Sequence, residues 1–222
     1  MRGAMKIIDD NTKRLHWWNR NFFYVVTVAV VLVNIILYGV LGNNWEQQFK
    51  PDSSWYSTLN FTGFVRGFLN SFSHENWQHV LLNMLCFLIC GLYLERKTGS
   101  LPFLGLVFVL TLFSALSTPA YGLYWHGFSG ANYALYGYII VDYPFTFRKR
   151  TRTKFNIIAG AVMLALIYFA ACFNGGMSGV GFAWYPYDFM TNMGHYSGFV
   201  VGLVIGLLVQ ICCLIARREE RR

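Results

Sequence analysis

Hydrophobic residues gather in long segments that short polar stretches separate. As a helix, an apolar run of about 20 residues crosses the ~30 Å hydrocarbon core of a bilayer. Six segments of the 222-residue chain approach this length, and the fourth has the weakest pattern: Phe22–Leu41, Trp77–Leu94, Leu101–Ala120, Ser129–Phe147, Phe155–Phe173 and Phe189–Ile215. The pattern predicts an all-α polytopic membrane protein with six transmembrane helices, of which the short fourth helix is central.

Composition and charge support this topology. Hydrophobic residues make up 55% of the chain and charged residues only 13%. Lys and Arg accumulate in cytoplasmic loops. With six spans, all of the 18 Lys and Arg residues except Lys50 and Arg66 fall on the side of the two termini. We therefore expect a cytoplasmic segment 1–21, a six-helix domain 22–216 and a cytoplasmic tail 217–222.

The same charges argue against some partners and processing steps. The basic clusters are short and each flanks a span, so the net charge of +8 requires no nucleic-acid partner. The first apolar segment is too long for a secretion signal and is interpreted as an uncleaved span. The five cysteines all lie inside predicted helices without metal-type grouping, which favours packing and predicts no metal or cofactor.

Two loops on the opposite side are unusual. Residues 42–76 mix many aromatic side chains with polar ones, which is typical of a loop partly embedded in the headgroup zone. Residues 174–188 combine glycine and proline with bulky aromatics, which indicates a mobile cover.

Polar residues inside a membrane span are costly, so each needs an explanation. In the second segment, His79 and Asn83 are four residues apart and project from one helical face, while His74 lies upstream in the loop. Alone, this pair favours a satisfied interfacial histidine and an interhelical hydrogen bond.

The fourth segment begins with the sequence GFSG, in which Gly127 and Gly130 surround Ser129. Tyr133 shares a face with Ser129, and Gly130, Ala134 and Gly137 form a small-residue stripe that permits close approach of another helix. Packing, with Ser129 as a helix N-cap, is the alternative interpretation.

Depth favours a functional interpretation of Ser129. If Asp142 marks the inner interface, 13 residues at ~1.5 Å place Ser129 about 20 Å above it and ~10 Å below the outer surface. The loop that precedes Ser129 must then enter the membrane. Non-helical backbone at that depth is tolerated only inside protein or beside a wet cavity, so a cavity is predicted.

The sixth segment has a histidine at its outer end and a ridge of glycines spaced four apart. The glycines, at positions 194, 198, 202 and 206, permit close helix contact but do not explain His195. If Gln210 marks the inner interface, His195 lies 15 residues, or ~22 Å, above it, which matches Ser129. Taking Arg217 as the marker instead raises His195 by a further ~10 Å.

A serine and a histidine at one depth point to nucleophilic catalysis. A neutral histidine takes the serine proton near pH 7. Glu95 and Asp142 are expected near the cytoplasmic side, and the other candidate carboxylates belong to outer loops, so we predict a Ser129–His195 dyad. Tyr133 is expected to stack on the imidazole. The Ser129 N–H, His79 and Asn83 are the candidate donors to a developing oxyanion.

Together these residues resemble the rhomboid family of intramembrane serine proteases, especially its compact six-helix bacterial members. The resemblance covers roughly residues 66–206 and rests on the H-x4-H-x3-N pattern, LERKTGS, GFSG with YALYGY, and H-x2-G-x3-G, which place His74, His79, Asn83, Glu95, Gly99, Ser129, Tyr133, His195, Gly198 and Gly202.

The resemblance implies a Ser129–His195 dyad, an oxyanion site using His79 and Asn83, and cleavage in or near a substrate's transmembrane segment. It also implies the bacterial inner membrane as location and lateral substrate access near the fifth span under a mobile cap. Val65 stands where many members have tryptophan, and the 174–188 loop is longer than in compact members.

Two other functions remain open from the sequence. A catalytically silent relative would bind client transmembrane helices, but such relatives usually lack the serine or the histidine, and both are present here. A transporter would also use a broken helix and buried histidines. No charged residue is expected in the middle of the membrane, which argues against that class.

Overall fold

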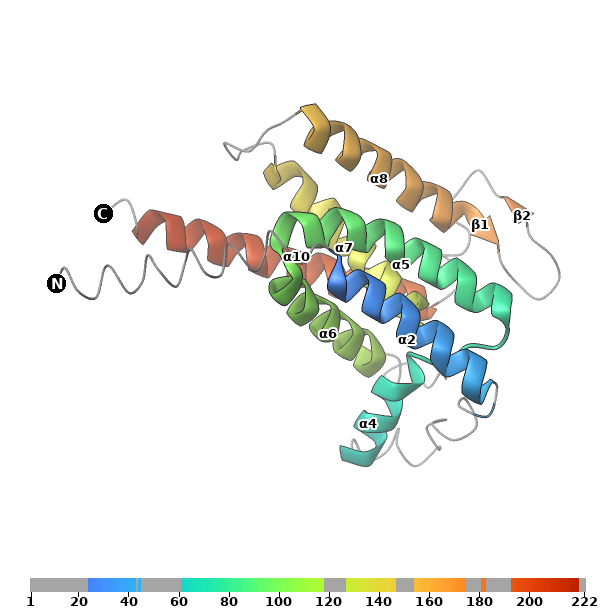
Figure 1. The fold of residues 1–222 in the computed structure, drawn as a ribbon. Helices are drawn as coiled ribbons and strands as arrows, with labels where there is room; N and C mark the ends of the chain where they lie inside the picture. Colours follow the sequence, from blue (N-terminus) through green and yellow to red (C-terminus); the bar gives the residue numbers. More distant parts are fainter. Residues whose placement is uncertain are drawn as a thin grey trace.

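The computed structural model describes residues 24–42, 44, 61–117, 127–146, 154–174, 181–182 and 193–219. In this part of the chain seven helices are present, together with one pair of two-residue strands (Figure 1). The elements are α2 (Val25–Leu41), α4 (Phe61–Asn70), α5 (Trp77–Thr98), α6 (Ser100–Ser117), α7 (Ser129–Thr146), α8 (Lys154–Cys172), β1 (Phe173–Asn174), β2 (Gly181–Phe182) and α10 (Met193–Glu219).

Each of the six apolar segments contains one long helix, and the bounds differ from the predicted ones by a few residues. By length and composition, α5 and the Met193–Ala216 part of α10 are able to cross a membrane. Val25–Leu41, Ser100–Leu116 and Gly160–Cys172 are shorter apolar helices. The six-span count itself is not decided by these lengths.

Helix α7 is the centre of the bundle. It contacts α5, α6, α8 and α10, and every residue from 131 to 139 is buried. Many large apolar side chains of α2, α6 and α10 are exposed instead, as expected for helices that face lipid. The central position predicted for this helix is therefore confirmed, but the helix is not short: its 18 residues match the 18 of α6 and exceed the 17 of α2.

One part of the 42–76 region is a helix and not a loop, which corrects our interpretation of that region. Phe61, Val65, Phe68 and Leu69 follow the spacing of an amphipathic helix, and α4 forms there. It packs on α6, where the rings of Phe68 and Phe108 lie 5.5 Å apart. Of residues 42–60, only 42 and 44 belong to the described part, so the predicted membrane embedding stays a prediction.

Little of the predicted cover loop lies within the described residues. Strand β1 pairs antiparallel with β2, with Phe173 opposite Phe182 and Asn174 opposite Gly181. The remaining positions of the 174–188 loop fall outside the described part, and the expectation of a mobile cover stays a prediction.

The buried carboxylate of Glu95 caps the N-terminus of α2. Both oxygens of Glu95 are used: Oε1 accepts from the Val26 N–H and the Ser100 hydroxyl, and Oε2 accepts from the N–H and the hydroxyl of Thr27. The first N–H groups of a helix have no acceptor within it, and a negative charge is favourable there. Glu95 thus ties the end of α5 to the start of α2.

Helices α7 and α10 form the most extensive helix contact in the described part of the chain. They run in parallel, and one separation of 68 residues relates contacting positions from end to end: Gly130 with Gly198, Ala134 with Gly202, Tyr138 with Gly206 and Asp142 with Gln210. A side chain at Gly202 would overlap the Ala134 carbonyl oxygen. The glycine ridge therefore sets backbone against backbone.

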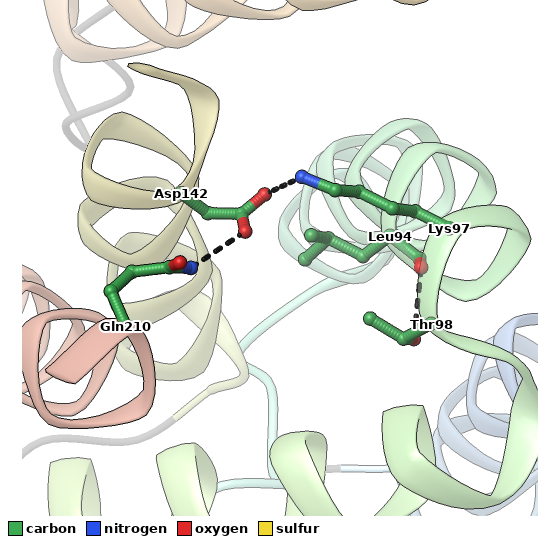
Figure 2. Close-up of polar contacts among 5 residues, drawn as sticks. All are labelled: Leu94, Lys97, Thr98, Asp142 and Gln210. Carbon is green, nitrogen blue, oxygen red and sulfur yellow. Dashed lines mark hydrogen bonds and ion pairs between the residues drawn. The ribbon is translucent and has the colours of Figure 1, made fainter. Parts of the chain in front are cut away.

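A polar cluster lies around Asp142, near the C-terminal end of α7 in this helix pair (Figure 2). Gln210 Nε2 donates to Asp142 Oδ1 at 3.0 Å, and the Lys97 ammonium of α5 forms an ion pair with Asp142 Oδ2. Asp142 and Gln210 are the two positions from which the depths of Ser129 and His195 were estimated. Their hydrogen bond shows that the two estimates start from one level.

Candidate active site

Ser129 is the first residue of α7, at the point where the preceding loop becomes a helix. The Asn132 N–H donates to the Phe128 carbonyl oxygen at 3.0 Å, and this bond starts the helix. Gly127 has a φ of +93°, which a residue with a side chain rarely adopts. The Ser129 N–H therefore lies at a helix N-terminus, where N–H groups lack helical acceptors and the dipole favours negative charge.

The two residues before Ser129 are held in place by aromatic packing and by a backbone hydrogen bond. Phe128 is fully buried, and its ring lies 5.5 Å from that of Phe72 and 5.2 Å from that of Phe87. The Gly127 N–H donates to the Asn70 carbonyl at 3.4 Å. Ser129 thus follows an anchored segment.

His74 contributes to this anchoring from the connection between α4 and α5. Its Nδ1 lies 3.2 Å from the Phe72 carbonyl, which can only accept, so Nδ1 carries the proton. Its Nε2 is then the acceptor for the Phe128 N–H, at a long 3.5 Å. His74 lies in the connecting segment, as expected, and contacts the backbone next to Ser129.

His79 and Asn83 both lie against Gly127. A Cβ atom at Gly127 would be 2.8 Å from His79 Cε1 and 3.5 Å from Asn83 Nδ2. The Asn76 side chain caps α5 by accepting from the His79 N–H at 2.8 Å, which fixes the first turn of that helix. The structure therefore brings the two candidate donors of α5 to the backbone two residues before Ser129.

His195 is buried near the start of α10 and stacks on Tyr133. The ring centroids are 4.3 Å apart and the planes differ by 7°. This is the stacking that we expected from the sequence. Because Tyr133 lies one turn below Ser129 on α7, the stacking holds the imidazole beside the start of that helix.

The immediate neighbours of Ser129 and His195 are also in contact. The Gly194 carbonyl oxygen lies 3.8 Å from the position of a Cβ atom at Gly130. A side chain at Gly198 would overlap the Gly130 carbonyl. The glycines that the sequence singled out therefore bring the N-terminal ends of α7 and α10 together.

Three residues of this region were not found from the sequence. Ser114 of α6 fills the space beside the two glycines, since its Oγ lies 2.5 Å from a Cβ position at Gly130 and 3.1 Å from one at Gly198. Phe128 and Asn132 are the others. Ser114 is far in sequence from the motifs, and Phe128 and Asn132 are ordinary residues in or next to GFSG, so only the position after folding distinguishes them.

The carboxylates are mostly engaged elsewhere. Glu95 and Asp142 accept hydrogen bonds near the C-terminal ends of α5 and α7, Glu75 is exposed, and Asp188 lies outside the described residues. Within the described ranges no group of three His, Cys, Asp or Glu side chains is placed to bind a metal ion. None of the five cysteines, all of which are described, forms a disulfide.

Comparison with known proteins identifies the family. The family model described as the Rhomboid domain matches residues 61–211, which is more than half of the chain. The chain belongs to the rhomboid family. Its helices are therefore those of a polytopic membrane protein.

Curated relatives from three distant organisms are similar in sequence to this chain. The chain is 28% identical over 199 residues to "Rhomboid-like protease 1" of Toxoplasma gondii, covering 84% of this chain and 59% of that protein. It is 26% identical over 194 residues to "Rhomboid protease GlpG" of Salmonella paratyphi A, covering 82% and 62%. "Rhomboid-like protein 11, chloroplastic" of Arabidopsis thaliana is 26% identical over 183 residues, covering 79% and 62%. The chain spans about three fifths of the length of these relatives.

Proposed function

We propose that this rhomboid protein is an intramembrane serine endopeptidase that uses Ser129 and His195 as a catalytic dyad. The observation that carries the proposal is the stacking of His195 on Tyr133, one turn from Ser129, at the outer end of a close helix pair. The names of the Toxoplasma and Salmonella relatives, both called proteases, support the reaction class.

In this mechanism, the Ser129 hydroxyl attacks the carbonyl carbon of a peptide bond while His195 accepts its proton. We propose that the Ser129 hydroxyl donates a hydrogen bond to the His195 imidazole before the attack. His195 then gives the proton to the leaving amine, and an acyl-enzyme remains on Ser129. Water, activated by His195, releases the acyl group. Two engaged carboxylates, Glu95 and Asp142, favour a dyad over a triad.

The negative oxygen that forms during attack needs hydrogen-bond donors. We assign this role to the Ser129 N–H, to the Asn83 side-chain amide and to His79. One such donor typically lowers the activation free energy by ~3 kcal/mol. The contact of His79 and Asn83 with the backbone at Gly127, and the helix N-terminus at Ser129, support this assignment.

The proposed substrates are membrane proteins that are cut in or near a transmembrane segment. We propose that α2, α5, α6, α7, α8 and α10 are six spans, with both termini in the cytoplasm, in a bacterial inner membrane. Substrates then approach from the lipid near α8, and the 174–188 loop covers the site. The basic residues on the side of the termini support this orientation.

The catalytically silent alternative is disfavoured by the residues that are present. Both Ser129 and His195 are retained, and the tyrosine stack holds the histidine in one orientation. A protein that only holds client helices has no need for either feature.

A fluorophosphonate probe tests the proposal directly. We expect the purified protein to be labelled, and the label to disappear in Ser129→Ala and His195→Ala. Ser197→Ala is the matched control, because Ser197 is a buried serine whose hydroxyl donates to Gly194 within its own helix. It should keep the label.

Cleavage of a model transmembrane substrate tests the dyad further. Ser129→Ala and His195→Ala should each abolish cleavage, and the double variant should be no worse than either, because the two residues act as a unit. Folded wild-type protein that neither reacts with the probe nor cleaves any of a panel of single-span proteins would favour the silent alternative. Clearly additive losses would contradict the dyad.

A further inference from the structure

Asn132 is a buried polar residue of α7 that the chemistry above does not use. It is only 2% exposed and lies three residues after Ser129. Its Nδ2 donates to the backbone carbonyl of Asn83 at 2.9 Å and lies 3.3 Å from the side-chain Oδ1 of Asn83. An amide in the interior of a membrane protein is costly unless its groups are paired, so this contact needs an explanation.

The contact determines which way the Asn83 amide points. The oxygen and nitrogen of an amide exchange places by a half turn, and the hydrogen bonds decide between the two orientations. The Asn83 backbone carbonyl can only accept, so the Asn132 atom that faces it must be Nδ2. Because Nδ2 is a donor, the Asn83 side-chain atom that faces it must be the oxygen. The Asn83 nitrogen therefore points away from Asn132.

On the side away from Asn132, the Asn83 amide faces the backbone at Gly127, two residues before Ser129. Asn83 Nδ2 is 3.5 Å from the Cβ position at Gly127. This nitrogen is buried and has no hydrogen-bond partner within the described residues. Buried donors are nearly always paired, so an unpaired one next to Gly127, two residues before the proposed nucleophile, fits a group whose acceptor forms only during the reaction.

We propose that Asn132 is a positioning residue that holds the Asn83 amide with its N–H₂ group toward the oxyanion. This inference rests on the proposed function. With the opposite orientation, the Asn83 oxygen would face the developing negative charge and repel it. Asn132 excludes that orientation, because it offers Asn83 a donor on one side and so reserves the nitrogen for the other.

The test is a set of variants measured by kcat and KM on one model transmembrane substrate. Asn132→Leu keeps the approximate shape and removes the donor. We expect kcat to fall about threefold to tenfold, the range for one neutral hydrogen bond. The fall should not exceed that of Asn83→Ala. KM should stay unchanged, because an oxyanion donor acts chiefly in the transition state.

The decisive measurement is the same substitution in the Asn83→Ala background. If Asn132 acts through Asn83, Asn132→Leu should cause no further loss there. Asn34→Leu is the matched control, because Asn34 is also fully buried and its Nδ2 donates to Val30 within α2. It should leave kcat unchanged. Asn132→Ala decides the question by the same criteria if Asn132→Leu does not fold.

The outcomes are distinguishable. Ser129-dependent cleavage with kcat unchanged in the Asn132 variants would overturn this inference and leave the proposed function intact. An equal fall in the Asn83→Ala background would also overturn it, since Asn132 would then act independently of Asn83. If the wild-type protein shows no Ser129-dependent cleavage, the proposed function is wrong and the inference fails with it.

Discussion

The two ends of the α7–α10 pair follow one register but treat their polar groups in opposite ways. At the C-terminal end of α7, both oxygens of Asp142 are engaged, one by Gln210 and the other by Lys97 (Figure 2). Near the start of α7, the Asn83 nitrogen of the neighbouring helix α5 is buried without a partner in the described part of the chain. Satisfied buried groups stabilise a fold, whereas an unsatisfied donor is available to a reacting atom. The surroundings of the pair therefore differ at its two ends: polar groups are satisfied around Asp142, and a donor of α5 stays unsatisfied near the start of α7.

Glu95 extends this contrast to a second helix pair. It accepts four hydrogen bonds where α5 meets the start of α2. Two carboxylates, near the C-terminal ends of α5 and α7, thus have partners for both oxygens. We expect substitutions there to affect folding, and substitutions near Ser129 to affect the reaction.

Among substitutions that test this comparison, Gly202→Val is expected to cause the largest loss of activity and stability. The new side chain would overlap the Ala134 carbonyl and push α10 away from α7, carrying His195 with it. A displacement of about 1 Å can cost about 100-fold in rate, so we expect near-complete loss of cleavage. Overpacking should also lower the free energy of unfolding by ~1–3 kcal/mol. Cleavage and melting temperature in one detergent measure both.

Gly206→Val is the matched control for that substitution. Its Cβ would meet Val141 Cβ at 3.0 Å and backbone atoms of Tyr138 at 3.4 Å, a looser contact one turn deeper. It should reduce activity less than Gly202→Val. Normal activity and stability of Gly202→Val would show that this contact does not position His195.

A smaller effect, confined to stability, is expected for Glu95→Gln. The amide replaces one accepting oxygen with a donor, which then faces N–H or hydroxyl donors. Loss of hydrogen bonds to a charged group should lower the free energy of unfolding by ~1.5–3 kcal/mol. The folded variant should keep the wild-type kcat. Glu75→Gln changes an exposed side chain and should leave the melting temperature unaltered.

The smallest effect is expected for Asp142→Asn. The new amide keeps an oxygen for Gln210 but loses the ion pair with the partly exposed Lys97. We expect ~1 kcal/mol of lost stability, because Lys97 is partly exposed and water can solvate its ammonium group when the ion pair is lost. The kcat should be unchanged, since the glycine contacts nearer to Ser129 still hold the register. A tenfold fall in kcat at an unchanged melting temperature would show that the cluster of Asp142, Gln210 and Lys97 positions the dyad.

Much of this fold could be predicted because its signals are local. The apolar segments identified every long helix within a few residues, and the glycines spaced by four identified the face of α10 that meets α7. Helix α4 was missed because residues 42–76 were interpreted as one loop by composition. The spacing of Phe61, Val65 and Phe68 carries the helical signal there.

The candidate site was partly predictable for the same reason. Ser129, Tyr133 and His195 stand in short patterns that indicate which side chains share a helical face. Asn132 follows Ser129 in a run that shows no such pattern. The sequence cannot tell whether its amide meets lipid, a backbone carbonyl or Asn83.

By itself, the sequence determined the helical segments, the small-residue faces and the residue types that meet at one depth. These depend on the periodicity of the helix and the hydrophobic thickness of a bilayer, which act within each segment. Only the tertiary structure decided the 68-residue register of α7 and α10, the position of Ser114 between their glycines, and the orientation of the Asn83 amide. Each of these results from contact between backbones or side chains that are far apart in the chain, and no local pattern encodes how far one helix slides along another.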